Sequence, residues 1–477
     1  MTSCHPVVAA CTMGSNSQED TICAIATPIG EGGIGILKIS GPEASAVAQK
    51  LFHPTSATCP LESHRLYHGW IRDPASAHPV DEVLLSYMAA PHTYTREPVV
   101  EINCHSGYAV LSRVLELVLE AGARLAEPGE FTRRAFLHGR IDLSQAEAVI
   151  EIVRSRSEQG LRAANRILRG DLSRKVESWR HNILGLQAEL EASIDFCEDL
   201  EDEPVNPHLM TQDLQESVLR PLEAILHQYE EGRILREGFT MVLVGKPNVG
   251  KSSLMNALLR RDRAIVTPLP GTTRDVIEDS FILSGILVRL LDTAGIRQRP
   301  DEIESLGIER TLKSVAEADL VLWLIDGSRP LTGEDDAVYD QIVSRRYVVL
   351  LNKADLPARI SVQDVQERYG SSVAIVVLSV LNPDDIESFR DFLIGAFLQD
   401  PLAMGQSMII PNLRHKECLE QALAALRRAH NLLQSSTYGE LASLELGAAR
   451  RQLESILGCV PDEDLLDRIF AQFCVGK

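Results

Sequence analysis

The chain has 477 residues, of which 45% are hydrophobic, and its formal net charge is −20. This length predicts roughly two to four domains, and the excess of acidic residues disfavours nonspecific contact with nucleic acid. The sequence has no apolar run of the roughly 20 residues that a membrane-spanning helix needs. Nine cysteines without a Cys-x-x-Cys pair argue against a disulfide framework or a zinc finger. We therefore expect a reduced, cytoplasmic protein without membrane contact.

Hydrophobic spacing divides the chain into segments of different character. Residues 1–20 lack the order of a signal peptide, and we expect a disordered tail. Residues 21–138 indicate a separate α/β domain, with strands at 21–26, 35–39 and 99–103 and a helix at 109–121.

Helical spacing then extends over 139–236, where Pro204 and Pro207 interrupt it and 209–236 resumes it. It returns within 400–477, at 413–433, 441–456 and 462–473. Because insertions are tolerated at exposed loop tips, we expect one helical domain interrupted by a second α/β domain at 237–399.

A glycine-rich loop lies at the start of this inserted domain. Gly245 to Ser252 reads Gly-Lys-Pro-Asn-Val-Gly-Lys-Ser, between an apolar run at 239–244 and a helical pattern at 253–261. The order of strand, glycine loop and helix start aims backbone N–H groups and the positive helix end at an anion. Lys251 would neutralise the outer phosphates of a nucleotide, and the Ser252 hydroxyl would bind Mg²⁺.

Two later strand ends indicate which nucleotide binds. The run at 288–291 ends in Asp292-Thr-Ala-Gly, an acid suited to hold Mg²⁺ through water. The run at 347–351 ends in Asn352-Lys-Ala-Asp355. Asp355 can accept hydrogen bonds from guanine N1–H and its exocyclic amine, while Asn352 would support the ring and the loop and the Lys353 stem would cover the base. The combination predicts a GTPase with a Ras-like P-loop domain.

The catalytic set differs from that of small regulatory GTPases, which carry a water-orienting Gln after Asp-Thr-Ala-Gly. This chain has Ile296 there, which cannot hydrogen-bond, so another residue must position the water. Thr273 is suited to close over Mg²⁺ and the γ-phosphate. Four acids follow in the sequence. Either one of them positions the water, acting through another water molecule, or all four lie on a solvated surface: Asp301, Glu302, Glu304 and Glu309.

Motifs at distant points of the chain resemble the MnmE (TrmE) family of tRNA-modifying GTPases. They are the phosphate loop, Pro270-Gly-Thr-Thr-Arg-Asp275, Glu127-Pro-Gly-Glu-Phe131 and the terminal Cys474-Val-Gly-Lys477. The resemblance runs from about Asp20 to the last residue and implies a folate-binding-like N-terminal domain through which the protein forms a homodimer.

It also implies a partner, the FAD-containing protein MnmG, in a heterotetramer or larger assembly. The pair would add an aminomethyl or carboxymethylaminomethyl group to C5 of the wobble uridine of certain tRNAs. The one-carbon unit would come from 5,10-methylene-tetrahydrofolate or a formyl analogue. GTP and K⁺ would bring two G domains together, and hydrolysis would release them.

The resemblance assigns residues as well. It implies that Asn248, Thr267, Leu269 and Thr272 hold K⁺, that Glu304 orients water, and that Lys38, Glu101, Arg140 and Lys477 contact folate. Ser252 and Thr273 would hold Mg²⁺. Cys474 either acts on the uracil or shapes the site, the alternative being a small buried hydrophobe. The other residues assigned to GTP are Val249, Gly250, Ser253, Pro268, Pro270, Gly271, Thr293, Ala294, Gly295 and Ser379.

The sequence departs from the family pattern at two relevant places. Lys38 stands where the family usually has Arg, and Ser379-Val-Leu-Asn-Pro383 stands where it often has Ser-Ala-x-x-Gly.

Two other functions compete with this interpretation. A ribosome-assembly GTPase switch of the Era or Der type should carry an RNA-binding or second G domain in place of the α/β domain and the terminal Cys-Val-Gly-Lys. A dynamin-like mechanical GTPase usually carries a membrane-binding segment, and the sequence shows none.

Overall fold

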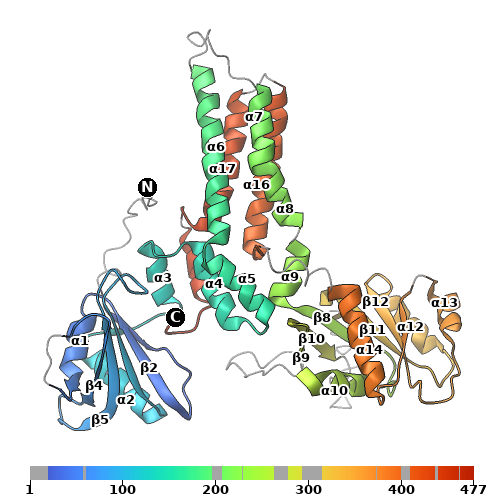
Figure 1. The fold of residues 1–477 in the computed structure, drawn as a ribbon, viewed down its shortest axis with the longest axis horizontal. Helices are drawn as coiled ribbons and strands as arrows, with labels where there is room; N and C mark the ends of the chain where they lie inside the picture. Colours follow the sequence, from blue (N-terminus) through green and yellow to red (C-terminus); the bar gives the residue numbers. More distant parts are fainter. Residues whose placement is uncertain are drawn as a thin grey trace. The chain divides into compact units, whose positions relative to one another are not determined.

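The structure, a computed structural model, describes residues 20–56, 61–195, 207–227, 229–262, 278–292, 314–371, 373–398, 409–435, 439–460 and 462–477. The chain divides into two compact units, each built from separate stretches of sequence (Figure 1). The first comprises 1–153, 167–223 and 413–477, and the second comprises 154–166 and 224–412. Within the described ranges, every helix is too short or too polar to cross a membrane.

A seven-stranded sheet forms the N-terminal part of the first unit. Its order is β3-β4-β5-β6-β2-β1-β7, and neighbouring strands are antiparallel except for β1 and β7. Helices α1 (Ala44–Leu51) and α2 (Tyr108–Glu120) bury their apolar stripes against it (Figure 1). The strands are β1 Ile22–Ile25, β2 Gly32–Ser40, β3 Phe52–Pro54, β4 Arg65–Arg72, β5 Pro79–Met88, β6 Val99–Ser106 and β7 Arg124–Leu125.

The predicted strands near 21–26, 35–39 and 99–103 are confirmed as β1, β2 and β6, and the predicted helix is α2. The sequence did not predict β3, β4 and β5. In β4, Arg65, Leu66 and His68 are all exposed, so polar and apolar residues do not separate cleanly onto two faces. Asp20, expected to end the tail, is described, and its carboxylate accepts hydrogen bonds from Arg124 and Arg134.

Helices from both ends of the sequence form the rest of the first unit. Helices α6, α7, α16 and α17 pack side by side (Figure 1), so the helical domain is interrupted by the second unit as expected. The helices are α3 Glu130–Leu137, α4 Leu143–Arg154, α6 Asp171–Asp195, α7 Pro207–Leu214, α16 Leu413–Gln434, α17 Gly439–Leu457 and α18 Glu463–Phe470.

The helical pattern predicted over 209–236 is confirmed in the described residues, with a π-helical turn within it. The structure has α7, a π-helical turn η1 (Gln215–Leu219), α8 (Arg220–His227) and α9 (Tyr229–Glu237). Pro221 lies directly after the π-helical turn. Because proline has no N–H to donate to the preceding turn, the hydrogen-bond ladder changes register before it.

The second unit is a six-stranded sheet covered on both faces. The order is β13-β12-β11-β8-β10-β9, parallel except for β9. Strand β8 directs Phe239, Met241 and Leu243 toward the core that contains α10 and α14, and Val242 and Val244 toward the core that contains α12 and α13. This period of two builds a three-layer α/β domain.

The three strands predicted in this unit are confirmed as β8, β10 and β12. Its strands are β8 Phe239–Val244, β9 Glu278–Leu283, β10 Ile286–Asp292, β11 Leu320–Asp326, β12 Tyr347–Asn352 and β13 Ile375–Val377. Its helices are α5 Glu158–Leu168, α9, α10 Lys251–Asp262, α12 Gly333–Ile342, α13 Val362–Tyr369 and α14 Pro383–Leu393, which continues as the π-helix η2 Ile394–Leu398.

A buried carboxylate joins α4 to α16. Glu147 accepts hydrogen bonds from Arg414 Nε at 2.8 Å and Nη2 at 2.6 Å, and it lies 2.7 Å from His415 Nε2. Arg414 also donates to the carbonyls of Ser455 and Ile456 in the last turn of α17. Burial acts to raise the pKa of Glu147, but the charges and hydrogen bonds of His415 and Arg414 lower it to about 2.

We expect Glu147 to make the first unit sensitive to acid. Because its pKa falls from 4.5 to about 2 on folding, it contributes stability above pH 4.5 that is lost as the pH drops toward 2. The contribution is on the order of 3 kcal/mol. Urea unfolding should be followed by the fluorescence of Trp179 in α6, after Trp70 and Trp323 are replaced by Phe.

In that background, Glu147→Gln should lower the free energy of unfolding at pH 7 and flatten its decline below pH 4.5. The matched control is Glu420→Gln on the surface of α16, where the side chain is 54% exposed. Equal acid sensitivity in wild type and Glu147→Gln would contradict the assignment.

Candidate functional site

The glycine loop at 245–250 joins the end of β8 to the start of α10. Gly245 and Gly250 have φ angles of +141° and +109°, which L side chains rarely adopt. A Cβ at Gly245 would lie 2.4 Å from the carbonyl oxygen of Leu324, and one at Gly250 would lie 2.3 Å from Asn352 Nδ2. Backbone angle and close packing therefore both require glycine at these two positions.

Lys251 lies at the first turn of α10 and reaches back into the loop. Its Nζ donates to the carbonyl oxygens of Gly245 at 2.6 Å and Lys246 at 2.8 Å, and the residue is buried. Ser252 and Ser253 follow on the same turn and are exposed. The loop thus presents an ammonium, two hydroxyls and the N–H groups of a helix start, which together suit an anion and a hard cation.

Asn352, the last residue of β12, ties two loops together. Its Nδ2 donates to the Val249 carbonyl oxygen at 2.7 Å, and its Oδ1 accepts from the Val380 N–H at 3.1 Å. The residue is 4% exposed, so these hydrogen bonds are shielded from water. Asn352 therefore sets the spacing between the phosphate loop and the loop that follows β13.

The residues expected to recognise guanine lie together at the carboxyl ends of β12 and β13. Asp355 Oδ1 accepts from Ser379 Oγ at 2.6 Å, and the Ser379 N–H donates to Asp385 Oδ2 at 2.7 Å. Lys353 has a left-handed φ of +66°, and its Nζ donates to Asp326 Oδ2 at 2.6 Å. Burial acts to raise the pKa of Asp326, but the hydrogen bonds from Lys353 and Ser328, together with the Lys353 charge, lower that pKa.

Asp326 was not among the predicted site residues, although a signal for it exists. It ends the apolar run Leu320–Asp326 and is followed by Gly327 and Ser328, much as Asp292 and Asn352 end theirs. A second unpredicted contact is the ion pair between Lys246 Nζ and Asp335 Oδ2 at 2.6 Å, which fastens the phosphate loop to α12.

Part of the predicted site lies outside the described residues, as does the side chain of Asp292, whose backbone ends β10. The predicted residues concerned are Thr267, Pro268, Leu269, Pro270, Gly271, Thr272, Thr273, Thr293, Ala294, Gly295 and Glu304.

A second group of predicted residues meets in the first unit. Lys38 on β2 lies opposite Glu101 on β6, with Lys38 Nζ 3.7 Å from Glu101 Oε1. The same Nζ lies 5.8 Å from the centre of the Tyr94 ring and 5.5 Å from that of Phe131. Arg140 stacks on Tyr94 with Cζ 4.9 Å from the ring centre and donates to the Tyr94 carbonyl at 3.2 Å.

The C-terminal tetrapeptide is folded against β1. Gly476 has φ +94°, and a Cβ there would lie 2.7 Å from the carbonyl oxygen of Ile25. Burial lowers the pKa of Lys38, and the charge of nearby Lys477 lowers it further. The charge of Glu101 acts in the opposite direction. Cys474 is exposed, so the expectation of a small buried hydrophobe is wrong.

We call Lys38, Arg140 and Lys477 the cation cluster. Its partners Tyr94 and Phe131 were not predicted to take part in it. An aromatic ring contributes to such a site by stacking with cations, a role that a one-dimensional pattern does not display.

The fold and the loop geometry of the second unit define a P-loop GTPase. Two family models match the chain. One described as the GTP-binding protein TrmE N-terminus matches residues 21–140, and one described as the MnmE helical domain matches residues 143–474. The chain belongs to the MnmE family of tRNA modification GTPases.

Relatives agree over nearly the whole length. The tRNA modification GTPase MnmE of Syntrophobacter fumaroxidans is 60% identical over 463 residues, covering 96% of this chain and 98% of that protein. The proteins of the same name from Carboxydothermus hydrogenoformans and Geobacillus kaustophilus are 45% and 43% identical, and each match covers 96% of this chain and at least 99% of the relative.

Among solved structures, Era from Aquifex aeolicus is 28% identical over 39% of this chain and 66% of that chain, with a TM-score of 0.27. At that score the similarity adds nothing to the family assignment.

Replacement of Asp355 by Asn should change which nucleotide binds. The Asn amide can donate to the 2-oxo group of xanthine, whereas it loses the charged acceptor for the guanine N1–H and amine. We expect the affinity for GDP to fall by about 100-fold or more, with a gain for xanthosine diphosphate, measured by calorimetry. The control is Asp384→Asn, an exposed acid on the neighbouring α14. Unchanged GDP affinity in Asp355→Asn would exclude this carboxylate from base recognition.

Proposed function

We propose that this protein is a K⁺-dependent GTPase that modifies C5 of the wobble uridine in certain tRNAs, together with an FAD-containing partner and a tetrahydrofolate one-carbon donor. The product would be an aminomethyl or carboxymethylaminomethyl uridine. The observation that carries the proposal is the packing of the terminal Cys474-Val-Gly-Lys477 against β1 beside Lys38. This packing places an exposed thiol in the same part of the first unit as the cation cluster.

The GTP side of the proposal rests on the loop of the second unit. Lys251 would exchange its two carbonyl partners for phosphate oxygens, and the exposed Ser252 hydroxyl would bind Mg²⁺, which favours oxygen ligands. Asn248 has a left-handed φ of +64° at the exposed tip of the loop. Its amide oxygen suits K⁺, which when bound would add positive charge where phosphoryl transfer develops negative charge.

The one-carbon side of the proposal rests on the cation cluster. Glu101 pairs with the Lys38 ammonium, and Lys477 adds a second positive charge close to it, so the cluster suits an anionic ligand. The glutamyl carboxylates of tetrahydrofolate suit these cations, and Glu101 suits the N–H edge of a pterin. The chemistry that such a cofactor supplies when bound is transfer of one carbon.

The same proposal includes a homodimer in the cytoplasm and a GTPase cycle that changes how two G domains associate. These points are supported by membership of the family and await direct measurement.

The proposed role of Asn248 predicts an ion preference. GTP turnover by the full chain should rise about tenfold or more when Na⁺ is replaced by K⁺, because a positioned cation stabilises the charge that develops in phosphoryl transfer. Asn248→Ala should abolish that preference while GDP binding remains. The matched control is Asn165→Ala on the exposed face of α5 in the same unit, which should keep the preference. Equal rates of phosphate release in Na⁺ and K⁺ would contradict the assignment of Asn248 as a K⁺ ligand.

The role in tRNA is tested by mass spectrometry of tRNA nucleosides from cells with and without the gene. Deletion should remove the C5 aminomethyl-type group from wobble uridine, and wild type should restore it. Complementation with Cys474→Ser distinguishes a thiol that acts on uracil from one that shapes the site, since the first fails to restore the group and the second restores it in part. Unchanged nucleosides after deletion would contradict the tRNA assignment and favour the ribosome-assembly alternative, which ribosome profiles would then test.

A further inference from the structure

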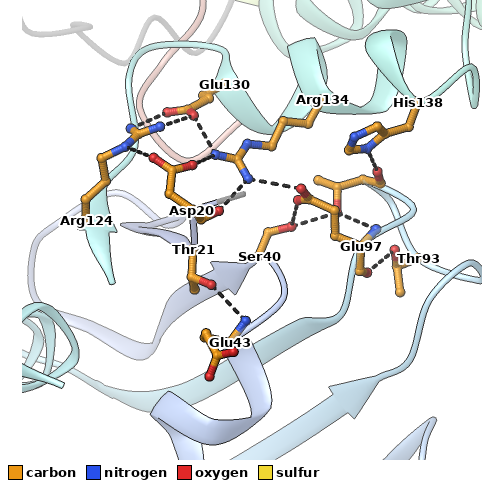
Figure 2. Close-up of polar contacts among 11 residues, drawn as sticks. Asp20, Thr21, Ser40, Glu43, Thr93, Glu97, Arg124, Glu130, Arg134 and His138 are labelled. Carbon is orange, nitrogen blue, oxygen red and sulfur yellow. Dashed lines mark hydrogen bonds and ion pairs between the residues drawn. The ribbon is translucent and has the colours of Figure 1, made fainter. Parts of the chain in front are cut away.

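Five charged side chains meet in the first unit (Figure 2). The Arg134 guanidinium donates to Glu97 at 3.0 Å, to the Asp20 carboxylate at 2.7 Å and to Glu130 at 2.9 Å. Arg124 donates to Asp20 and Glu130 as well, at 2.5 and 2.6 Å. We call Asp20, Glu97, Arg124, Glu130 and Arg134 the buried ion cluster.

Three members of this cluster are poorly exposed, whereas Arg124 and Asp20 are 39% and 33% exposed. The side chains of Arg134, Glu97 and Glu130 are 6%, 10% and 10% exposed. Burial acts to raise the pKa values of Asp20 and Glu130, but the two guanidiniums outweigh it and lower both. Removing charges from water costs free energy, and well-packed apolar residues often stabilise a protein equally well. The stability of the fold therefore does not by itself explain such a cluster. Its directional hydrogen bonds do, however, define geometry.

Glu97 connects three segments of the chain through this cluster. Its Oε2 accepts from Ser40 on β2 at 2.8 Å, and its Oε1 accepts from Arg134 on α3. On its own loop, its carbonyl accepts from Thr93 Oγ1 at 2.6 Å and its N–H donates to Thr95 Oγ1 at 3.3 Å. Figure 2 shows Glu97 between Ser40 and Arg134, with Thr93 beside it.

These three segments carry Lys38 itself and the two aromatic rings beside its ammonium. Lys38 lies two residues before Ser40 on β2, and alternate residues of a strand share a face. Tyr94 is the neighbour of Thr95, and Phe131 lies three residues before Arg134 on α3, which places both on one helix face. Both rings that lie near the Lys38 ammonium are therefore on segments tied to Glu97 within three residues of the contact.

Further hydrogen bonds extend the connection to Arg140. The ring nitrogen Nδ1 of His138 lies 2.6 Å from the carbonyl oxygen of Thr95. The Tyr94 hydroxyl lies 3.0 Å from Thr132 Oγ1 on α3. The loop that carries Tyr94 is thus held at Tyr94 by α3 and at Thr95 by His138, two residues before Arg140.

We propose that Glu97 is a positioning residue for the one-carbon donor site, setting the separation of Lys38, Tyr94 and Arg140 without contacting the ligand. This inference rests on the proposed function of the cation cluster. It extends the site to a residue that no family motif or pattern in the sequence indicated.

The test measures binding of 5-formyl-tetrahydrofolate to the full chain by calorimetry, with GDP affinity and Tm in parallel. Glu97→Gln and Ser40→Ala should each raise the Kd for the folate by about tenfold or more, because small displacements of positioned groups cost this much. GDP affinity should not change. With the partner protein and tRNA, the variants should raise KM for the folate donor more than they lower kcat.

The matched control is Asp81→Asn, another buried acid of the same sheet, which accepts from the His105 N–H and contacts its ring at 2.7 Å. It should leave the folate Kd unchanged. If Glu97→Gln fails to fold, Ser40→Ala decides, since it removes a neutral hydroxyl and leaves the ion pairs in place.

Wild-type Kd values in both variants, whatever their Tm, would overturn the positioning role. Absence of folate binding by the wild-type protein would instead overturn the proposed function of the cluster, and this inference with it.

Discussion

The paired hydrogen bonds of one amide, that of Asn352, determine how the second unit presents a nucleotide site. One side of the amide holds the phosphate loop at Val249, and the other holds the loop after β13 at Val380. The approach is so close that residue 250 must be glycine. A phosphate-binding loop and a base-binding loop lie far apart in sequence, and a rigid link between them lets one nucleotide satisfy both. The strands on either side supply the rigidity, because they are buried on both faces.

In the first unit, ion pairs and hydrogen bonds hold together segments that are distant in the sequence. The three members of the cation cluster come from β2, from the segment after α3 and from the last residue of the chain. Like charges repel, so such a set persists only where other groups hold it in place. Tyr94 and Glu101 act directly on Lys38. The buried ion cluster acts one step further away, by fixing the segments on which these groups lie.

The terminal tetrapeptide shows how distant segments are brought to one place. Its approach to β1 depends on Gly476, whose backbone angle and lack of a Cβ allow contact with Ile25. Helix α18, which precedes the tetrapeptide, packs on α3. The contact is close, because a Cβ at Gly129 would lie 2.7 Å from the carbonyl oxygen of Phe470. The exposure of Cys474 follows from this packing, because the neighbours Phe473 and Gly476 take the buried positions.

The sequence by itself determined the class of the inserted domain, the strands that end in functional residues and the interruption of the helical domain. Glycine loops, buried strands and helical periodicity are local or periodic properties, and the pattern of side chains records them. Only the tertiary structure decided that Asp326 holds Lys353, that Tyr94 and Phe131 receive Lys38, and that Glu97 joins three segments. Strands β3 to β5 were also found only in the tertiary structure, because their buried and exposed residues do not follow the alternation of polar and apolar residues in the sequence. Such contacts join residues far apart in the chain, and no spacing rule along one dimension encodes which of them meet.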